Sequence, residues 1–480
     1  MDENLVNSHK QTLTRPPHSC ILLQNESRTA VLLDLPRSIE EAQVLSSRLT
    51  PTAMSVARRS AAEEDMETAD GTHRKKLRAL VSVAPLAVPF PTPEPKVKDG
   101  DGDGYVAGGP ATAGPAAQKL KLAELMTLAT VEAALGDIER SSRDGLWCLP
   151  RYCHPPTSCS SSPAKQQQQQ QQQDPPMSGE PGSKSKTAAA PAASSRPDTE
   201  ELTHGSSPCA SAANNTSPQD NDNAPTPYII PEAARYLLGS ISQQREAFLA
   251  AVPPASLDLI VLDPPWPNRS AQRKRKRRGG GGGDSAAAYQ TAGDAAAVRE
   301  LLSLVPVASR LAADGLVAVW VTNSPSRSAD LLVGPRGIFS QCWDVELVGE
   351  WIWLKVTSRG EPVVPLASAW RKPWERLLIA RKRRTTAPAA GGETRRRAIP
   401  TKVIVTAPDV HSRKPNLRRL FEEEPGLLPP DGEYCAMEVF ARNLTAGWWA
   451  WGDQVLLFQH RDHWEPDNAP PVVEPGVQEP

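Results

Sequence analysis

The sequence predicts an α/β fold with a mainly parallel sheet of about seven strands, preceded by a largely disordered N-terminal region. Two observations lead to this prediction. From Tyr228 onward, short apolar runs alternate with helical patterns, which is typical of a sheet that helices cover on both faces. Eleven of the twelve tryptophans lie between Trp266 and Trp464, whereas the whole 480-residue chain has 48 prolines and only 6 phenylalanines. We therefore expect one ordered domain, in the C-terminal half.

Seven short apolar runs are expected to be strands of this sheet. They cover residues 257–262, 316–321, 345–354, 376–380, 402–406, 434–440 and 455–458. Helical patterns over residues 294–313 and 412–424 lie between several of them. The second helix is expected to begin with Ser412 as its N-cap and with Pro415 in its first turn, where a helix tolerates proline.

The N-terminal half divides by composition. Residues 1–60 predict a small element, able to dock on the main domain, in which strands at 20–23 and 30–34 precede a helix over 38–48. Residues 61–153 are partly helical and otherwise poorly defined. Their amphipathic pattern over 118–139 favours a helix packed on its own chain over a dedicated partner helix. The remaining divisions are a low-complexity linker at 154–224, the main domain at 225–463 and a disordered tail at 464–480.

Charge and cysteine content exclude several classes of protein. Lys and Arg total 54 against 55 Asp and Glu, so the net charge of −1 gives no overall preference for polyanions. The seven cysteines are scattered, and the N-terminus lacks the blocks of a signal peptide, which favours a reducing intracellular compartment. The most apolar stretch, 79–90, contains prolines, so we expect no membrane span. The group Cys148, Cys153, His154 and Cys159 has no C-x2-C pair, so we expect no metal site.

The most informative motif is Asp263-Pro264-Pro265-Trp266, which directly follows the predicted strand 257–262. Open α/β sheets bind ligands at the carboxyl ends of their strands, which is where this motif lies. The two prolines stiffen the turn and remove two N–H donors, so carbonyl oxygens face outward beside the Asp263 carboxylate, and Trp266 offers a flat apolar face. This set suits a planar base with an amino group. The alternative is a helix-breaking turn with Trp266 in the core.

Such a site suits methyl transfer to an exocyclic amine. Asp263 and the Pro264 carbonyl can accept both N–H groups and so direct the nitrogen lone pair toward a methyl donor. Positive charge develops on that nitrogen in the transition state. A preorganised carboxylate therefore stabilises the transition state more than the ground state.

Further short motifs follow one another in a fixed order between residues 228 and 460. They are Tyr228-Ile-Ile-Pro, Asp263-Pro-Pro-Trp266, Val319-Trp-Val-Thr-Asn323, Glu350-Trp-Ile-Trp-Leu-Lys355, Lys372-Pro-Trp-Glu375, Ser412-Arg-Lys-Pro415, Asp431-Gly-Glu-Tyr434, Phe440-Ala-Arg-Asn-Leu444, and Gly447-Trp448 with Trp451-Gly452. Together they resemble the adenine-N6 methyltransferase family that includes the mRNA N6-adenosine writers, and most closely its methyltransferase-like protein 4 branch. Residues upstream of 225 match weakly or not at all.

The resemblance implies a Rossmann-like methyltransferase that uses S-adenosyl-L-methionine and is permuted, so that the catalytic motif precedes the main cofactor-binding segment. It implies that Asp263, Pro264, Pro265 and Trp266 are catalytic. The cofactor-binding residues that it implies are Ser240, Ile241, Asp263, Lys414, Arg442, Asn443, Asp453 and Gln454. The substrate-binding residues that it implies, near the acceptor adenosine, are Asn268, Tyr289, Trp353, Lys355 and Glu375, and no metal is implied.

Three residues depart from the family's pattern, namely Ser240 for an acidic residue, Arg413 for a histidine and Asp453 for an asparagine. Lys414 has a separate reason to bind an anion. It is expected in the first turn of a helix, where a lysine does not suit the helix dipole, although a solvated lysine is the alternative. Trp353 is expected to share a strand face with Trp351, so that one wall serves as both core and base platform.

Two basic runs suggest a positive rim around the site. Arg273 to Arg278 precede five glycines, and Arg381 to Arg384 are followed by Arg395 to Arg397. The first run is expected to bind nucleic-acid phosphates, to serve in nuclear import, or both, and a solvated run without either role is the alternative.

The functional hypothesis is an S-adenosyl-L-methionine-dependent adenine-N6 methyltransferase that acts on RNA, such as small nuclear RNA, or on DNA. We expect nucleic acid as partner, no membrane, and a nuclear location with a cytoplasmic pool left open. A monomer is one possibility and a partner subunit another. The alternative function is a catalytically silent nucleic-acid-binding subunit, which the three departures favour and the intact Asp263 motif disfavours.

Overall fold

The computed structural model describes residues 19–46, 78–91, 115–142, 145–153, 227–267, 295–322, 328–368, 371–383, 398–429 and 433–466. All of them belong to one compact unit. The strands are β1 (Ile21–Gln24), β2 (Ala30–Leu33), β3 (Arg235–Leu238), β4 (Leu257–Leu262), β5 (Leu311–Val321), β6 (Val345–Lys355), β7 (Trp374–Lys382), β8 (Lys402–Thr406), β9 (Ala436–Val439) and β10 (Trp449–Gly452).

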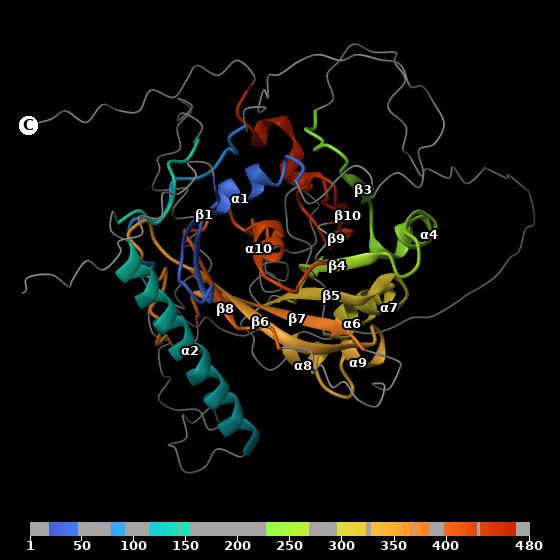
Figure 1. Ribbon diagram of the computed structural model, residues 1–480, viewed down its shortest axis with the longest axis horizontal. Coiled ribbons are helices and arrows are strands. Elements are labelled where there is room, and N and C mark those ends of the chain that lie inside the picture. The colour runs from blue at the N-terminus through green and yellow to red at the C-terminus, as the bar shows by residue number, and fades with distance from the viewer. Residues whose placement is uncertain are drawn as a thin grey trace, which may run out of the picture. The chain divides into compact units, whose positions relative to one another are not determined.

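Along the chain, helices alternate with many of these strands (Figure 1). They are α1 (Leu35–Glu41), α2 (Pro115–Ser141), α4 (Ile241–Ala251), α6 (Ala295–Leu304), α7 (Val307–Arg310), α8 (Ser328–Leu332), α9 (Ile338–Gln341) and α10 (Arg418–Glu423), with 3-10 turns η2 (Leu457–Gln459) and η3 (Arg461–His463) near the end of the described chain.

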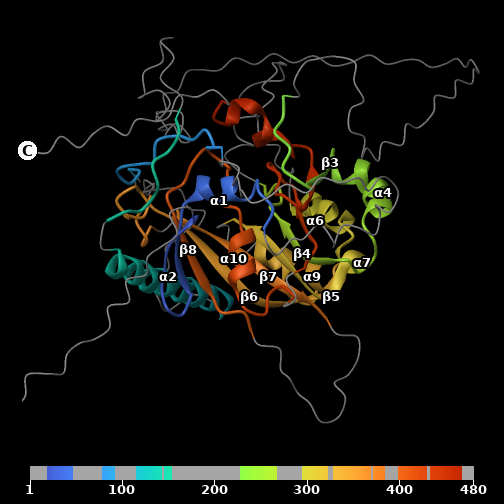
Figure 2. The same ribbon diagram turned by 45° about the horizontal axis from the view of Figure 1, so that its top comes forward.

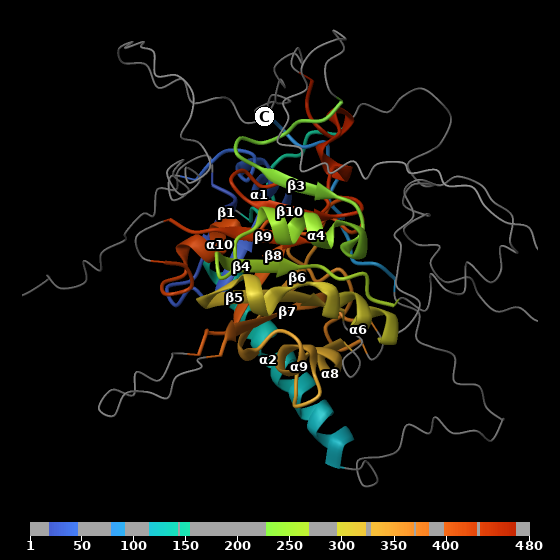
Figure 3. The same ribbon diagram turned by 90° about the vertical axis from the view of Figure 1, so that its right-hand side faces the viewer.

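The strands form one ten-stranded sheet in the order β1-β2-β8-β6-β7-β5-β4-β9-β10-β3. Figure 3 shows β3 beside β10 at one end of this order. Six neighbouring pairs are parallel, while β7 runs antiparallel to both β5 and β6, and β1 runs antiparallel to β2. The predicted α/β class with a mainly parallel sheet is therefore confirmed. Because β7 is reversed, its first residues lie at the edge where the parallel strands end.

Both faces of the sheet are buried, which explains the continuous apolar strands. Along β4, Leu259 and Val261 join one apolar cluster, whereas Ile260 and Leu262 join another on the opposite face. Helices α1 and α10 cover the first face, and α4, α6, α7, α8 and α9 contribute to the second (Figures 1 and 2). Helix α2 covers a third cluster, on strands β2, β6 and β8.

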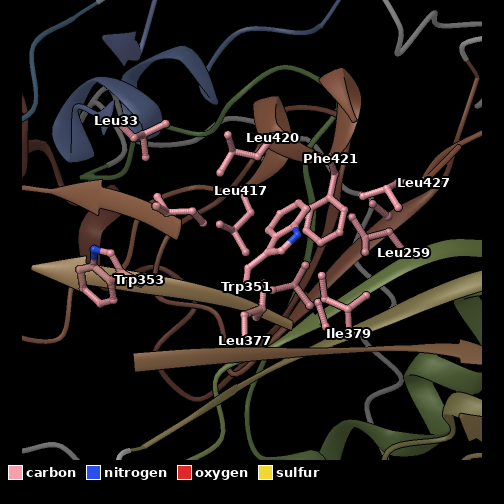
Figure 4. Close-up of a cluster of buried hydrophobic side chains, with 14 of the residues drawn as sticks. Leu33, Leu259, Trp351, Trp353, Leu377, Ile379, Leu417, Leu420, Phe421 and Leu427 are labelled. Atoms are coloured by element: carbon pink, nitrogen blue, oxygen red, sulfur yellow. The ribbon is translucent and has the colours of Figure 1, made fainter. Parts of the chain in front are cut away.

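Helix α10 packs on the sheet through large side chains. Phe421 lies against Trp351, with ring centroids 4.7 Å apart, and Leu417 and Leu420 lie beside them (Figure 4). Trp353 belongs to the same cluster, as its spacing from Trp351 predicts. The first face thus forms a continuous apolar layer that reaches the end of β6.

In the described residues the sheet has ten strands, where the sequence predicted about seven. The apolar run 455–458 is not a strand, because Leu457 N–H donates to the Gln454 carbonyl and the chain forms a 3-10 turn. The last strand is instead β10, four residues that the sequence pattern did not mark. Strand β3 was also missed, and β1 and β2, expected as a separate element, extend the same sheet beside β8.

Three predicted helices have different bounds. Helix α1 begins at Leu35, earlier than predicted, because Asp34 accepts from the Arg37 N–H as its N-cap. The pattern over 294–313 breaks at Pro306 into α6 and α7, and β5 begins at Leu311. The helix expected from residue 412 begins only at Arg418.

Candidate active site

Four of the charged residues among the predicted catalytic, cofactor and substrate residues meet at the carboxyl edge of the sheet. Asp263 follows β4, Lys355 ends β6, and Lys414 lies in the loop after β8. Glu375 is the second residue of β7, whose reversed direction brings it to this edge, opposite Trp353 of β6. Four segments that are distant in sequence therefore contribute charged side chains to one place.

The charges alternate along a chain of four side chains. Lys414 Nζ lies 3.2 Å from Asp263 Oδ1 and 2.9 Å from Glu375 Oε2. Lys355 Nζ lies 2.5 Å from Glu375 Oε1. Burial alone would raise the pKa of the Glu375 carboxyl, but Lys355 and Lys414 hold that pKa well below its usual range. Glu375 is therefore ionised at neutral pH.

Two tryptophans form the apolar base of this site. The rings of Trp320 and Trp353 meet edge to face, with centroids 5.9 Å apart. Lys355 Nζ lies 4.4 Å from the centroid of Trp353, and Lys414 Nζ lies 5.5 Å from that of Trp320. The indole N–H of Trp353 donates to Thr406 Oγ1 at 2.7 Å, which fixes the ring. Trp320 was not among the predicted site residues, although it lies in the Val319–Asn323 motif.

The Asp263-Pro264-Pro265-Trp266 turn differs in part from its predicted form. Trp266 is only 5 % exposed, and its indole N–H donates to the Trp320 carbonyl at 2.7 Å. Its backbone N–H donates to the Pro264 carbonyl at 2.8 Å, so one lone pair of that oxygen is already engaged. Trp266 packs in the core, as the alternative interpretation held. Its indole supports the turn and Trp320, and its catalytic assignment remains a prediction.

Apart from Asp263 and Lys414, the predicted cofactor residues gather at the ends of three adjacent strands. Ser240 follows β3, Arg442 and Asn443 follow β9, and Asp453 and Gln454 follow β10. A hydrogen bond from Gly239 N–H to the Gly452 carbonyl, at 3.2 Å, ties two of these strand ends together. Their roles as cofactor ligands remain predictions.

Local contacts distinguish these residues from one another. Ser240 caps α4, because its Oγ accepts from the Gln243 N–H at 3.3 Å, while Ile241 is only 2 % exposed. Arg442 Nη1 donates to the Ser412 carbonyl at 3.1 Å, whereas Asp453 is exposed. The Ser240 hydroxyl is thus already engaged at the helix N-terminus.

Lys414 does not lie in a helix, so the helix-dipole argument for it was wrong. The chain from residue 407 to residue 417 is a loop, within which Ser412 has a φ of 70°. Inside this loop Arg413 forms a buried ion pair with Asp409. This pair closes the turn before Lys414 and delays the helix, which the sequence pattern alone did not reveal.

The expected basic rim is only partly described. Arg273 to Arg278, Asn268, Tyr289 and residues 384 and 395–397 lie outside the described residues. Arg381 and Lys382 end β7 and pair with Glu346 and Val345 at the start of β6. They therefore lie at the edge opposite Asp263, so this part of the prediction was wrong. The reason is the reversed direction of β7.

Glu438 of β9 is a site residue that the sequence argument missed. It pairs with Val261 of β4, and the next residue, Val439, pairs with Leu262. Glu438 therefore lies close to Asp263, which directly follows β4. Burial, and then the charge of Asp263, raise the pKa of the Glu438 carboxyl from 4.5 to about 8. The available signal was a single acidic residue within the apolar run Ala436–Val439.

Two further observations concern the described residues only. None of their helices is long and apolar enough to cross a membrane. They contain no group of three or more His, Cys, Asp or Glu side chains suited to a metal ion, and Cys148 and Cys153 are free thiols.

Comparison with known proteins identifies the family. The family model MT-A70 matches residues 257–454. The "N6-methyladenosine RNA methyltransferase MTA1" of Cryphonectria parasitica is 37 % identical over 92 % of this chain and 94 % of its own, and that of Pyricularia oryzae is 39 % identical over 92 % and 96 %. The human "N(6)-adenine-specific methyltransferase METTL4" is 34 % identical over 49 % of this chain and 44 % of its own. The chain therefore belongs to the MT-A70 family, as its motifs predicted.

Proposed function

We propose that this protein is an S-adenosyl-L-methionine-dependent methyltransferase that methylates N6 of adenine in RNA. The observation that carries the proposal is the chain of ion pairs Asp263–Lys414–Glu375–Lys355 above Trp320 and Trp353. RNA is the favoured substrate because two relatives that match over 94 % and 96 % of their own length are named RNA methyltransferases. DNA is the alternative, since a more distant relative from Caenorhabditis elegans is named "DNA N6-methyl methyltransferase".

The residues at the strand ends suit the proposed cofactor. Lys414 presents an ammonium group for a carboxylate, and it already bridges two carboxylates in the structure. Arg442, Asn443, Asp453 and Gln454 would bind the carboxylate and ribose hydroxyls, and Ile241 would contact the adenine. Bound S-adenosyl-L-methionine supplies an electrophilic methyl group.

The protein's own part in the reaction is to orient and polarise the amine. The Asp263 carboxylate and the free lone pair of the Pro264 carbonyl would accept its two N–H groups. Trp353 would contact the flat face of the base, and Lys355 and Glu375 its polar edge. Since positive charge grows on nitrogen as the methyl group arrives, the Asp263 carboxylate stabilises the transition state most.

The substrate base must leave any helix to reach this site. Asp263 and Glu375 are half-buried among the strand ends, with side chains 13 % and 18 % exposed. A base stacked within a duplex cannot reach these two side chains without being flipped out. Single-stranded RNA avoids that cost, so we propose unpaired adenosines as the preferred targets.

The alternative of a silent subunit is disfavoured by the same geometry. A protein that only binds nucleic acid does not need Lys414 between two carboxylates at a strand end. Ser240 and Arg413 depart from the family pattern, yet Ser240 caps α4 and Arg413 pairs with Asp409. Both departures thus have structural roles that leave the proposed chemistry intact.

The test is a methyl-transfer assay with labelled S-adenosyl-L-methionine on matched single-stranded RNA, duplex RNA, single-stranded DNA and duplex DNA. Digestion to nucleosides identifies the product. We expect N6-methyladenosine from single-stranded RNA at the highest rate. Product from DNA alone would change the substrate class, and no product from any of the four would contradict the enzyme proposal.

We also propose a nuclear location, with Arg273 to Arg278 as the import signal. Replacing these six residues by alanine in a fluorescent fusion is expected to move the protein to the cytoplasm. An unchanged nuclear signal would contradict this assignment.

A further inference from the structure

A buried cluster of charged and polar side chains precedes Lys414 in the loop after β8. Asp409 and Arg413 are 7 % and 2 % exposed, and Arg413 Nη1 lies 2.5 Å from Asp409 Oδ2. Arg151 forms a second ion pair, with Nη1 3.6 Å from Asp409 Oδ1. The Ser82 hydroxyl donates to Asp409 Oδ2 at 3.2 Å. We name these four residues the Asp409 cluster.

The Asp409 cluster joins three segments that are far apart in the sequence. Arg413 donates to the Val81 carbonyl at 2.9 Å. Arg151 donates to three backbone carbonyls, those of Val83, Pro408 and Ala407, at 3.0, 2.8 and 2.8 Å. Segments 78–91 and 145–153 are thus bonded directly to the loop that carries Lys414. Both segments lie outside residues 257–454, which the family model matches.

The cluster encloses a strained turn. Ser412 has a φ of 70°, a left-handed conformation that costs a non-glycine residue energy and persists only where its surroundings impose it. The Arg413 N–H donates to the Val410 carbonyl at 3.0 Å, and Arg442 holds the Ser412 carbonyl at 3.1 Å. The imposed turn ends at Lys414.

No helix or strand fixes the backbone of Lys414, because β8 ends at Thr406 and α10 begins at Arg418. A lysine side chain has four rotatable bonds and so does not by itself fix its ammonium group. If the backbone of Lys414 moves, that group can leave its place between Asp263 and Glu375. The place of that ammonium group therefore depends on what holds the turn.

We propose that the Asp409 cluster is a positioning device for Lys414, through which Ser82 and Arg151 of the N-terminal segments set the affinity for the cofactor. This inference rests on the proposed function, in which Lys414 binds the cofactor carboxylate. The competing account is that the cluster only stabilises the fold.

The experiment compares Arg151→Lys and Ser82→Ala with a matched control, Arg310→Lys, all in the full chain. Arg310 is another buried arginine, 9 % exposed, that donates to a backbone carbonyl, that of Leu249, at 3.0 Å. It directly precedes β5, at the edge opposite Lys414. Each variant is measured for thermal midpoint, for the Kd of S-adenosyl-L-methionine and for kcat and KM.

The positioning account predicts a rise of about tenfold in both the Kd and the KM for S-adenosyl-L-methionine in Arg151→Lys, which corresponds to ~1.4 kcal/mol. The kcat at saturating cofactor is expected to stay within about twofold of the wild type. Ser82→Ala is expected to raise the same Kd and KM by a smaller factor. Arg310→Lys is expected to lower the thermal midpoint without changing the Kd. An unchanged Kd in Arg151→Lys, or an equal change in Arg310→Lys, would overturn the proposal.

A second readout separates this proposal from the proposed function. Hydrogen exchange of the backbone amides between residues 409 and 417 is measured without cofactor in the same variants. Faster exchange in Arg151→Lys, but not in Arg310→Lys, is expected if the cluster holds the loop, and equal exchange contradicts it. A folded wild type that binds no S-adenosyl-L-methionine would refute the proposed function and, with it, the link between the cluster and cofactor affinity. The hydrogen-exchange measurement would still decide whether the Asp409 cluster holds the loop.

Discussion

Lys414 is the residue on which the site geometry depends most. Its ammonium group contacts Asp263 and Glu375, while Lys355 contacts only the second of these. Hydrogen bonds between oppositely charged groups are stronger than those between neutral groups, particularly when they are partly withdrawn from water. Glu375 keeps one counter-charge if Lys414 is removed, so the fold is expected to survive that change.

Lys414→Ala is therefore expected to weaken cofactor binding rather than to unfold the protein. A hydrogen bond to a charged group contributes about 1.5–3 kcal/mol, so the Kd for S-adenosyl-L-methionine should rise roughly tenfold to a hundredfold. Titration calorimetry measures the change. Lys382→Ala is the control, because Lys382 donates to the Ala308 and Leu311 carbonyls at the opposite edge of the sheet. Equal Kd values for Lys414→Ala and the wild type would contradict this role.

Glu438 provides a prediction about pH. Its pKa in the folded protein is about 8, because burial and the nearby Asp263 disfavour its ionised form. The folded state therefore binds a proton that the unfolded state has released between pH ~4.5 and ~8. The contribution of Glu438 to the free energy of unfolding is full below this window and is lost as the pH rises through it.

Glu438→Gln, which removes the ionisation and keeps the shape, is expected to flatten that dependence. The free energy of unfolding, from urea titrations between pH 5 and pH 8.5, should decline more with rising pH in the wild type than in the variant. The free energy of unfolding of the wild type, relative to that of Glu438→Gln, should therefore fall steadily as the pH rises through this window. Parallel curves for both proteins would show that Glu438 ionises with an ordinary pKa.

The sequence could predict residue types and motifs better than their contacts. Asp263, Lys355, Glu375 and Lys414 were identified by their motifs, and the structure brings all four together. Trp320 and Glu438 were missed because their importance comes from strands that pair only in the fold. The engagement of Ser240 as a helix cap likewise depends on where α4 begins.

At the scale of elements, the N-terminal strands and helix complete the catalytic domain. Strand β2 pairs with β8, and Leu22, Ala30 and Leu32 share an apolar cluster with Val403 and Val405. Helix α2 covers that cluster through Val131, Ala134, Leu135 and Ile138, all at most 8 % exposed. Residues upstream of 225 thus bury one end of the sheet, beside β8, after which the loop with Lys414 follows.

A fragment that begins at residue 225 is accordingly expected to fail as a folded domain. Removal of the residues before 225 exposes the edge of β8 and an apolar cluster, and such exposure favours aggregation. Soluble yield and thermal unfolding of the fragment test this. Deleting residues 157–221 from the predicted linker is the control, since it leaves every described element in place. A fragment that unfolds cooperatively at the wild-type temperature would show that the N-terminal elements are dispensable.

Elements with strong local signals were predicted well. The strands 257–262 and 402–406 have the predicted bounds, and α2 appears over Pro115–Ser141 where a helix over 118–139 was expected. The short strands β3 and β10, of four residues each, carry too few residues for a pattern. The turn before Lys414 was misread because a pair of buried charges, not local propensity, decides its shape.

At the scale of the whole molecule, the site is a product of the sheet order. Strands β5, β7 and β6 lie between β4 and β8, so Asp263 and Lys414 meet only because the loop after β8 crosses toward β4. The N-terminal segments hold that loop through Asp409 and Arg413. The central claim is that this assembled edge methylates adenine, with Asp263 as the group that accepts the amine.

The most direct test compares methyl transfer by Asp263→Ala and Asp258→Asn, two changes in or beside β4. Asp258 accepts from the Cys435 N–H at 2.9 Å near the other end of that strand. With single-stranded RNA and saturating S-adenosyl-L-methionine, Asp263→Ala should lower the rate of N6-methyladenosine formation by at least about a hundredfold. Asp258→Asn should keep a rate within about threefold of the wild type. Retention of wild-type turnover by a folded Asp263→Ala protein would contradict the account.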